Sequence, residues 1–500
     1  MAVAERTTRL TSNELPSPKG TKLLLVVPDG VGVRNFLHGR FLNVWQQLAG
    51  VESLETCSGL PVGPLREVVG NSLAETRMHE MPIYRETPAT GFVRKSLEVA
   101  HLARFRTAGM RYVLDMGKPR GRSRRAMLNR LAYFTGQLLS KPKGIARLNR
   151  LHLRRVMMNG LTDHYRSLLR SIRPSVVFFT HQRPPQIFPL AAAARSLGIP
   201  TACFIFSWDN LSSKGRMPVL FNHYLVWSDR MRDELLRFYP DVHMRQVHVV
   251  GTPQFEPYDY EDFGWTEARF CEETGASLGR RRICFSAGDA TTSPNDPQYI
   301  EALAQANRER AFGEGVELIV RSSPAEEGDR FVAVIANHPE VIWSPPRWVQ
   351  TRSGHPEPWS QRVPQAGDID LLKSLTRYCD VNVNMASTMT LDFSFAGKPV
   401  VNVASGNGQY GAPWSDLFFY DYDHYRPVLE LGAARLALNP AELVLAVNRY
   451  LDDPTLDSEG RAALLEMQVS VPLHGTSERI ARTLATVAET VIAGLGGKLK

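Results

Sequence analysis

The 500-residue chain has little cysteine. Its five cysteines, Cys57, Cys203, Cys271, Cys284 and Cys379, are scattered and form no Cys-x-x-Cys pair. The sequence therefore predicts neither a zinc site of the usual spacing nor a disulfide framework. So few cysteines are typical of a reducing compartment, and we expect a cytoplasmic protein.

Long hydrophobic runs are also missing. No stretch approaches the roughly 18 apolar residues that span a bilayer. Residues 1–20 lack the apolar centre of a signal peptide, and we expect them to form a disordered arm. Hydrophobic residues make up 43% of the chain and charged residues 22%, as in ordinary globular proteins of two or three domains.

Several catalytic signatures are absent. The sequence has no Gly-x-x-x-x-Gly-Lys-Ser/Thr loop, which argues against ATP hydrolysis by a P-loop, and no His-Glu-x-x-His or Gly-x-Ser-x-Gly motif. Acidic residues and histidines do not cluster in a pattern that demands a metal. We expect neither a metal nor a cofactor.

Acidic residues are nearly missing from one segment. Residues 101–155 contain fifteen lysines and arginines but one acid, Asp115, so this segment carries +14 and the rest of the chain −6. Apolar residues such as Phe105, Met127 and Phe134 are interleaved with the bases. Basic helices with an apolar face suit an anionic membrane surface, or RNA and DNA; the alternative is a solvated helical insertion. We favour the inner face of the plasma membrane over nucleic acid.

Short apolar runs, each followed by a helical pattern, predict two open parallel sheets. The runs in the first half are Lys22–Val27, Ser175–Thr180, Thr201–Phe206, His223–Trp227 and Gln246–Val250. Those in the second half begin at Ile283, Val316, Val341, Val381 and Val400. Residues 52–169 lack this alternation and are predicted to be mostly helical.

We therefore predict an α/β protein with two Rossmann-like parallel-sheet domains that face a cleft. The expected divisions are an arm (1–20), a first domain (21–253) with a basic helical insertion at about 85–170, a linker (254–282), a second domain (283–473) and a C-terminal helix (474–500). Ligands of such sheets bind beyond the carboxyl ends of the strands.

Polar loops follow the predicted strands at that edge. In the first half they contain Asp29, His181 and Asp209, although each of these residues is also common in caps, surfaces or Asx turns. Phosphate-binding groups follow strands of the second half: Gly288, Thr291, Arg321, Ser387 and Thr388. Asp392, within the following helix, can hold a ribose or sugar hydroxyl. Together these loops indicate a nucleotide diphosphate; ordinary caps and a surface ion pair are the alternatives.

The segments IFPLAAAARSLGIPTACFIFSWDNLSSKG and STMTLDFSFAGKPVV carry a family resemblance. With VELIVRSSP and HGTSERIA, they resemble GT-B glycosyltransferases of the bacterial surface-polysaccharide UDP-glycosyltransferase type, over about residues 174–485. The second half is also similar to CDP-glycerol glycerophosphotransferases. Those enzymes usually have a histidine where this chain has Ser323, which argues against a glycerophosphotransferase.

The resemblance implies a mechanism. The second half would bind a nucleotide-sugar, most often UDP-linked, through Gly288, Thr291, Arg321, Ser323, Ser387, Thr388 and Asp392. The first half would bind a polysaccharide or lipid-linked acceptor, with Asp29, His181 or Asp209 as the base, and no metal would be needed. The alternatives are a non-hydrolysing UDP-sugar 2-epimerase and a non-catalytic scaffold or nucleic-acid-binding protein on the same fold.

Overall fold

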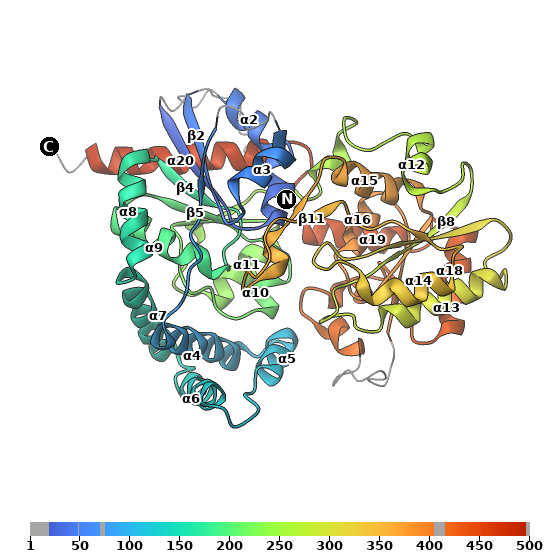
Figure 1. Ribbon diagram of the computed structural model, residues 1–500, viewed down its shortest axis with the longest axis horizontal. Helices are drawn as coiled ribbons and strands as arrows, with labels where there is room; N and C mark the ends of the chain where they lie inside the picture. The colour runs from blue at the N-terminus through green and yellow to red at the C-terminus, as the bar shows by residue number, and fades with distance from the viewer. Residues whose placement is uncertain (1–19, 49, 71–75, 405–415, 497–500) are drawn as a thin grey trace, which may run out of the picture.

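The computed structural model describes residues 20–48, 50–70, 76–404 and 416–496. Figure 1 shows two α/β domains side by side, each built on a parallel sheet, which confirms the predicted fold class. Of the expected arm, residues 1–20, only Gly20 lies within the described residues.

The first domain contains a seven-stranded parallel sheet in the order β3-β2-β1-β4-β5-β6-β7. Its strands are β1 Thr21–Val27, β2 Val51–Ser58, β3 Arg77–Glu80, β4 Val176–Phe179, β5 Thr201–Phe204, β6 His223–Val226 and β7 Val247–Val249. Strands β1, β4 and β5 are almost wholly buried, because helices cover both faces of the sheet. These helices are α1 Gly30–Gly32, α2 Phe41–Gln47, α3 Val62–Val69, α9 Phe188–Ser196, α10 Asn210–Ser213 and α11 Asp229–Phe238, with a π-helical turn η1 Val33–Leu37.

The second domain contains a six-stranded parallel sheet in the order β10-β9-β8-β13-β14-β15. Its strands are β8 Arg281–Ser286, β9 Val316–Arg321, β10 Ile342–Trp343, β13 Val381–Asn384, β14 Val400–Val403 and β15 Arg435–Ala437. Its helices are α12 Glu267–Thr274, α13 Asp296–Arg308, α14 Val332–Asn337, α15 Asp368–Tyr378, α16 Met389–Phe395, α17 Arg426–Glu430, α18 Pro440–Asp452 and α19 Ser458–Gln468. The strand order places β8 and β13 at the centre, so the loops that follow them meet at one edge.

The prediction that residues 52–169 are mostly helical is wrong for their first part. Residues Val51–Ser58 form β2, which pairs in parallel with β1, and Arg77–Glu80 form β3 at the edge of the sheet. Charged residues in both strands interrupt the apolar run that marks a buried strand. Strand β3 tolerates such residues because one side of it is unpaired. Strand β2 is paired on both sides, and its charged residues lie in its first half, which is not buried.

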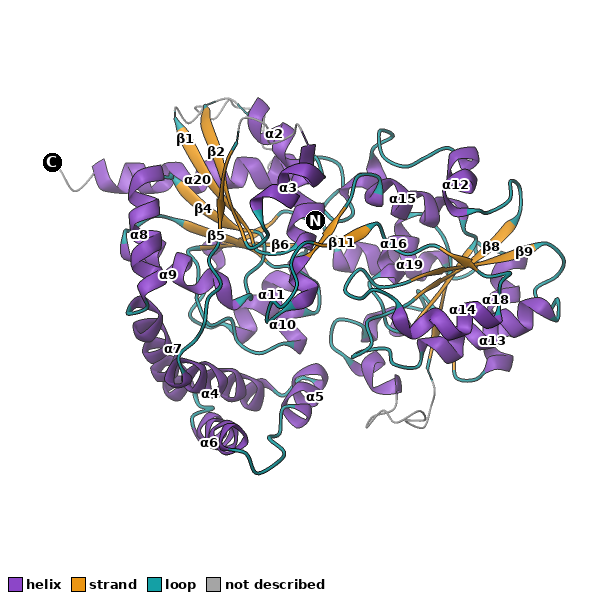
Figure 2. Ribbon diagram, in the orientation of Figure 1, coloured by secondary structure: helices purple, strands orange, loops and turns teal. Residues whose placement is uncertain are grey.

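The remainder of that stretch is helical. It forms α4 Pro88–Phe105, α5 Ala108–Met116, α6 Arg124–Leu138, α7 Pro142–Met157 and α8 Gly160–Ile172. The side chains of Thr87, Thr107 and Ser123 accept hydrogen bonds from the first turns of α4, α5 and α6, which fixes where these helices begin. Helices α4 to α7 project below the first sheet, and α5 lies on the side that faces the second domain (Figures 1 and 2).

The last helix, α20 Thr476–Gly496, returns to the first domain and lies along its sheet (Figure 1). The Ser477 amide donates to Glu256 Oε1 at 2.9 Å, and Arg479 Nε donates to the carbonyl of Val250 at 3.1 Å. The end of the chain, which follows the second domain in sequence, is therefore anchored to the first domain and the segment after it. Within the described residues, no helix combines the length and apolar character needed to cross a membrane.

A two-stranded hairpin of the second domain reaches across to the first. It consists of β11 Trp348–Gln350 and β12 Arg362–Pro364, and Gln361 Nε2 donates to the Gly59 carbonyl at 3.3 Å. A Cβ on Gly30 would lie 1.8 Å from the Arg362 carbonyl oxygen. The glycine after β1 therefore allows close approach of a protein backbone rather than of a ligand.

We expect Gly30→Ala to loosen this contact between the domains. Overpacking of this kind costs about 1–3 kcal/mol, so the apparent Tm should fall by about 2 °C or more. Gly63→Ala in α3 is the matched control, because a Cβ there would meet no described atom within 4 Å. Scanning calorimetry that gave the two variants the same Tm would contradict the assignment.

Candidate functional site

A cavity of about 640 Å³ lies between the two domains, at the carboxyl ends of both sheets. Asp209 lines it, and so do all seven predicted donor-binding residues: Gly288, Thr291, Arg321, Ser323, Ser387, Thr388 and Asp392. Tyr112, Val113 and Met116 of α5 also line it, so the helical insertion forms part of its wall. The topology thus brings together residues that are far apart in sequence, from Val31 to His424.

Two arginines line this cavity from opposite domains. Arg321 ends β9, is buried, and donates from Nη2 to Asp368 Oδ1 at 3.3 Å. Its Nη1 has no hydrogen-bond partner among the described residues. Arg34 lies in the π turn after β1. Burial lowers the pKa of Arg34, and the nearby positive charge of Arg321 lowers it further. Two partly unsatisfied cations facing one cavity favour an anionic ligand.

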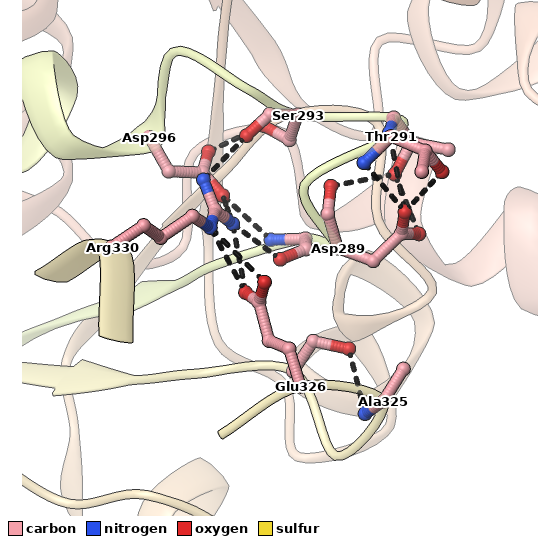
Figure 3. Close-up of polar contacts among 10 residues, drawn as sticks. Asp289, Thr291, Ser293, Asp296, Ala325, Glu326 and Arg330 are labelled. Atoms are coloured by element: carbon pink, nitrogen blue, oxygen red, sulfur yellow. Dashed lines mark hydrogen bonds and ion pairs between the residues drawn. The ribbon is translucent and has the colours of Figure 1, made fainter. Parts of the chain in front are cut away.

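The loop between β8 and α13 is held rigid by its own carboxylates. Figure 3 shows the hydroxyl and amide groups of Thr291 directed at Asp289, and the Thr292 hydroxyl also donates to Asp289 Oδ2 at 2.8 Å. Figure 3 also shows Arg330 between Asp296 and Glu326, and Arg330 donates to the Gly288 carbonyl at 2.7 Å. The result is a preformed wall of the cavity.

The expectation that Gly288 and Thr291 offer free donors is therefore wrong in its detail. The Gly288 amide donates to Asp296 Oδ2 at 2.8 Å, and the Thr291 amide donates to Asp289 Oδ1 at 2.9 Å. Burial raises the pKa of Asp296 to about 7, against opposing contacts from Ser293 and Arg330. Both residues line the cavity, but a ligand there has to take its hydrogen bonds elsewhere.

The loop between β13 and α16 lies opposite. Ser387 Oγ accepts from the Met389 amide at 3.3 Å, and the Ser387 amide donates to Asn384 Oδ1 at 2.9 Å. Thr388 is the N-cap of α16 but makes no side-chain cap with a described residue. Ala386 has a φ of 44°, a left-handed conformation that is strained for a residue with a Cβ. Ser323 Oγ, across the cavity, accepts from the Ala325 amide at 3.2 Å.

Asp392 lies at the back of the cavity and is almost fully buried. Tyr258 Oη donates to Asp392 Oδ1 at 2.8 Å, which leaves Oδ2 for a ligand hydroxyl. Burial raises the pKa of Asp392 to about 6, although Tyr258, Arg34 and Arg321 favour the charged form. Its protonation therefore changes within the range in which stability is easily measured.

We expect this carboxyl group to make the protein less stable as the pH rises. Its pKa in the folded state is about 6, above the ordinary 3.8, so its contribution is fully present below about pH 4 and is lost as the pH rises through 6. The loss amounts to about 2–3 kcal/mol in the free energy of unfolding. Asp392→Asn should remove this pH dependence, because an amide does not titrate in this range. The variant should still fold, because the amide oxygen can accept from Tyr258. Denaturant titrations at pH 4.5 and 7.5 would contradict this if wild type and variant changed in parallel.

Asp209 lies on the first-domain side of the cavity. Its carboxylate accepts from Ser213 Oγ at 2.9 Å and lies 3.4 Å from Lys214 Nζ. Burial alone would raise the pKa of Asp209, but Lys214, His424 and nearby hydroxyls hold it well below its usual range. A carboxylate held so firmly in its charged form is a poor proton acceptor.

The other two predicted catalytic residues form a pair beside the cavity. His181 Nδ1 lies 2.7 Å from Asp29 Oδ2, and both side chains are buried. Asp29 also caps α1 by accepting from the Gly32 amide at 3.0 Å. His181 stacks on Phe206 with ring centroids 3.9 Å apart. This carboxylate–histidine pair leaves Nε2 of the imidazole for a second partner.

His181 lines a second pocket of about 290 Å³, which adjoins the first. Phe206 and Lys214 line both spaces. The loop between β11 and β12 brings Glu357 and Trp359 of the second domain over His181, with the Trp359 ring centroid 6.2 Å away. Burial raises the pKa of Glu357, and its Oε2 has no hydrogen-bond partner among the described residues.

Sequence reasoning missed four residues of this region: Arg34, Glu357, Trp359 and His424. Arg34 follows the first strand, and its position at the carboxyl end of a parallel strand could have marked it as a ligand-binding candidate. His424 lines the cavity next to Trp208, and burial lowers its pKa to about 4, so it is neutral at pH 7. Nothing in the sequence pattern singles out Glu357, Trp359 or His424.

Solved structures resemble the chain over nearly its whole length. A UDP-N-acetylglucosamine 2-epimerase matches with a TM-score of 0.53 at 11% identity, covering 96% of this chain and 97% of that one. The Neisseria meningitidis UDP-GlcNAc 2-epimerase bound to UDP-GlcNAc matches at 0.51 and 10%, covering 93% and 100%. The chain has the GT-B fold.

A third match carries the same fold. It is the Staphylococcus aureus MnaA structure with UDP, at a TM-score of 0.50 and 9% identity, covering 92% of this chain and 94% of that one. The predicted GT-B fold is thus confirmed, and at these identities the likeness concerns the fold alone. No protein-family model and no curated protein sequence matches the chain.

Proposed function

We propose that the protein is a glycosyltransferase that moves a sugar from a nucleotide-sugar to a polysaccharide or lipid-linked acceptor. UDP is the favoured nucleotide, because two similar structures are described with UDP or UDP-GlcNAc. The cavity between the domains is the donor site, and the pocket beside it is the acceptor site. The carrying observation is that second pocket, with His181 in its wall and Asp29 hydrogen-bonded to His181 behind it.

On the donor side, the two arginines supply the electrostatic part of the reaction. As the glycosidic C1–O bond to the diphosphate breaks, negative charge grows on the leaving diphosphate oxygen. Arg321 and Arg34 line the cavity from opposite domains, and preorganised cations of this kind stabilise the leaving group. The loops at Ser387 and Ser323 contribute polar groups to the same space.

On the acceptor side, His181 acts as the base. Asp29 accepts from Nδ1–H and fixes the tautomer, so Nε2 takes the proton as the acceptor hydroxyl oxygen bonds to C1. Asp209 is the weaker choice because its pKa is lowered, and we assign it a positioning role through Lys214. Trp359 offers an aromatic face to a sugar ring.

A 2-epimerase is the second candidate, because similar structures carry that name. An epimerase acts on the nucleotide-sugar alone and has no need of a pocket beyond the donor cavity. The glycerophosphotransferase alternative lacks support at Ser323, whose hydroxyl is bonded to the backbone of its own loop.

Product analysis distinguishes these reactions. We would incubate the protein with UDP-GlcNAc and other UDP-sugars, with and without oligosaccharide or polyprenyl-diphosphate-linked acceptors, and follow the products by NMR and mass spectrometry. The proposal predicts UDP and a glycosylated acceptor only when the acceptor is present. A C2-epimerised nucleotide-sugar formed without acceptor would establish the alternative, and the Arg321→Gln variant controls for a contaminating enzyme.

A further inference from the structure

Exposed large apolar side chains are concentrated in the helical insertion. Eight of the fifteen in the described part of the chain fall within residues 116–158, less than a tenth of the sequence. Five of the eight belong to α6: Met127, Leu128, Leu131, Phe134 and Leu138. Phe134 is 62% exposed and Leu138 is 82% exposed. Such a concentration on one helix is unusual for a surface that faces only water.

The α6 ridge, defined as Met127, Leu131, Phe134 and Leu138, occupies one face of the helix. These positions recur at intervals of four, three and four residues, which places them in one stripe. The opposite face packs on α4, where a Cβ on Gly136 would lie 2.6 Å from the Ser96 carbonyl oxygen. The helix is thus held firmly from behind, and its apolar stripe points away from the protein.

The helical insertion that carries the ridge also carries many exposed cations. Arg120, Arg122, Arg124, Arg125 and Arg130 near α6, and Lys141, Lys143, Arg147, Arg150, Arg154 and Arg155 on and before α7, are all exposed. Among the described residues, Lys118 is the one lysine or arginine of 101–155 in an ion pair with an acid, and its partner is Asp115. An apolar stripe bordered by unneutralised bases is complementary to an anionic lipid surface, where acyl chains meet phosphate headgroups.

We infer that the α6 ridge inserts into the interface of an anionic bilayer, with the flanking bases bound to lipid headgroups. RNA fits less well, because its phosphates would engage the bases but leave the ridge in water. A second copy of the chain fits less well, because it would bring two strongly positive segments together.

The insertion connects this surface to the cavity. Helix α5, which precedes α6, contributes Tyr112, Val113 and Met116 to the cavity wall. The helix that we place in the bilayer interface therefore follows directly, in sequence, a helix of the cavity wall. This inference concerns lipid binding alone and does not depend on the reaction that the cavity supports.

Vesicle flotation without any nucleotide-sugar tests the inference. We expect wild type to bind phosphatidylcholine vesicles with about 30% phosphatidylglycerol and to bind pure phosphatidylcholine at least about tenfold more weakly. The variant Leu131→Ser/Phe134→Ser/Leu138→Ser should lose at least about tenfold in binding to anionic vesicles. Leu278→Ser/Val332→Ser/Leu445→Ser is the matched control, since it removes three exposed apolar side chains of the second domain, and it should bind like wild type.

A fluorescent label on the ridge reports whether the ridge inserts into the bilayer. All five native cysteines are buried, so Leu138→Cys can be labelled selectively with an environment-sensitive dye, and Leu445→Cys serves as its control. The dye at residue 138 should shift to the blue on anionic vesicles and be quenched by brominated acyl chains, whereas the dye at 445 should not respond. Unchanged vesicle binding by the ridge variant would overturn the inference. So would a dye at 138 that responds to RNA or to protein concentration but not to lipid.

Discussion

Replacing Arg321 with glutamine should weaken UDP binding at least about 30-fold, since a desolvated charged contact is worth about 2–5 kcal/mol. Arg321 is buried at the end of β9 and lines the cavity, Asp368 accepts from its Nη2, and its buried Nη1 has no partner among the described residues. Removing the guanidinium deletes one of the two cations that face the ligand. Calorimetric titration of UDP into wild type and variant measures the difference.

Two companion variants make this result specific. Arg310→Gln removes an exposed arginine of the same domain, paired with Glu314, and should leave UDP affinity unchanged. Arg321→Lys keeps the charge but loses the planar fork, so it should fall between wild type and Arg321→Gln. If Arg321→Gln folds with an unaltered Tm and binds UDP like wild type, the cavity does not bind a diphosphate in the way we propose.

Replacing His181 with alanine should lower kcat by about 10²- to 10⁴-fold, as expected for loss of a general base. The KM for the nucleotide-sugar should change little, because His181 lines the neighbouring pocket rather than the donor cavity. Asp29→Asn should lower kcat in the same direction, since the amide no longer fixes the tautomer of the imidazole.

The control for the His181→Ala variant is a substitution of a histidine that lines neither pocket. His248→Gln, in β7, should leave kcat unchanged. A His181→Ala variant with normal kcat and a raised KM for the acceptor would show that His181 binds the acceptor without accepting its proton. Asp209, or His424 beside it, would then be the next residue to test.

The architecture was predictable where burial is uniform. Runs such as Leu23–Val27 and Leu318–Val320 are apolar on both faces, and only a covered parallel sheet buries them entirely. Strands β2 and β3 escaped prediction because charged residues interrupt their apolar pattern. Glu52 and Glu55 lie in the half of β2 that is not buried, and Arg77 lies in the edge strand β3.

The candidate site was predictable in part, because parallel strands bring their following loops to one edge. That rule placed Arg321, Ser387 and Asp209 in one cavity. It did not reveal that Asp289 and Asp296 already occupy the donors of their own loop. Nor did it reveal that a hairpin of the second domain carries Glu357 to His181, since neither contact has a local signature in the sequence.

The most direct test of the account is a thermal-shift series with UDP, GDP and CDP on wild type, Arg321→Gln and Arg310→Gln. A ligand that binds the folded state at about 100 times its Kd stabilises it by about 2.7 kcal/mol, which raises the Tm measurably. If the cavity binds UDP through Arg321, UDP raises the Tm of wild type and of Arg310→Gln but not of Arg321→Gln. A Tm that none of the three nucleotides changes in wild type, or an equal rise in all three proteins, would contradict it.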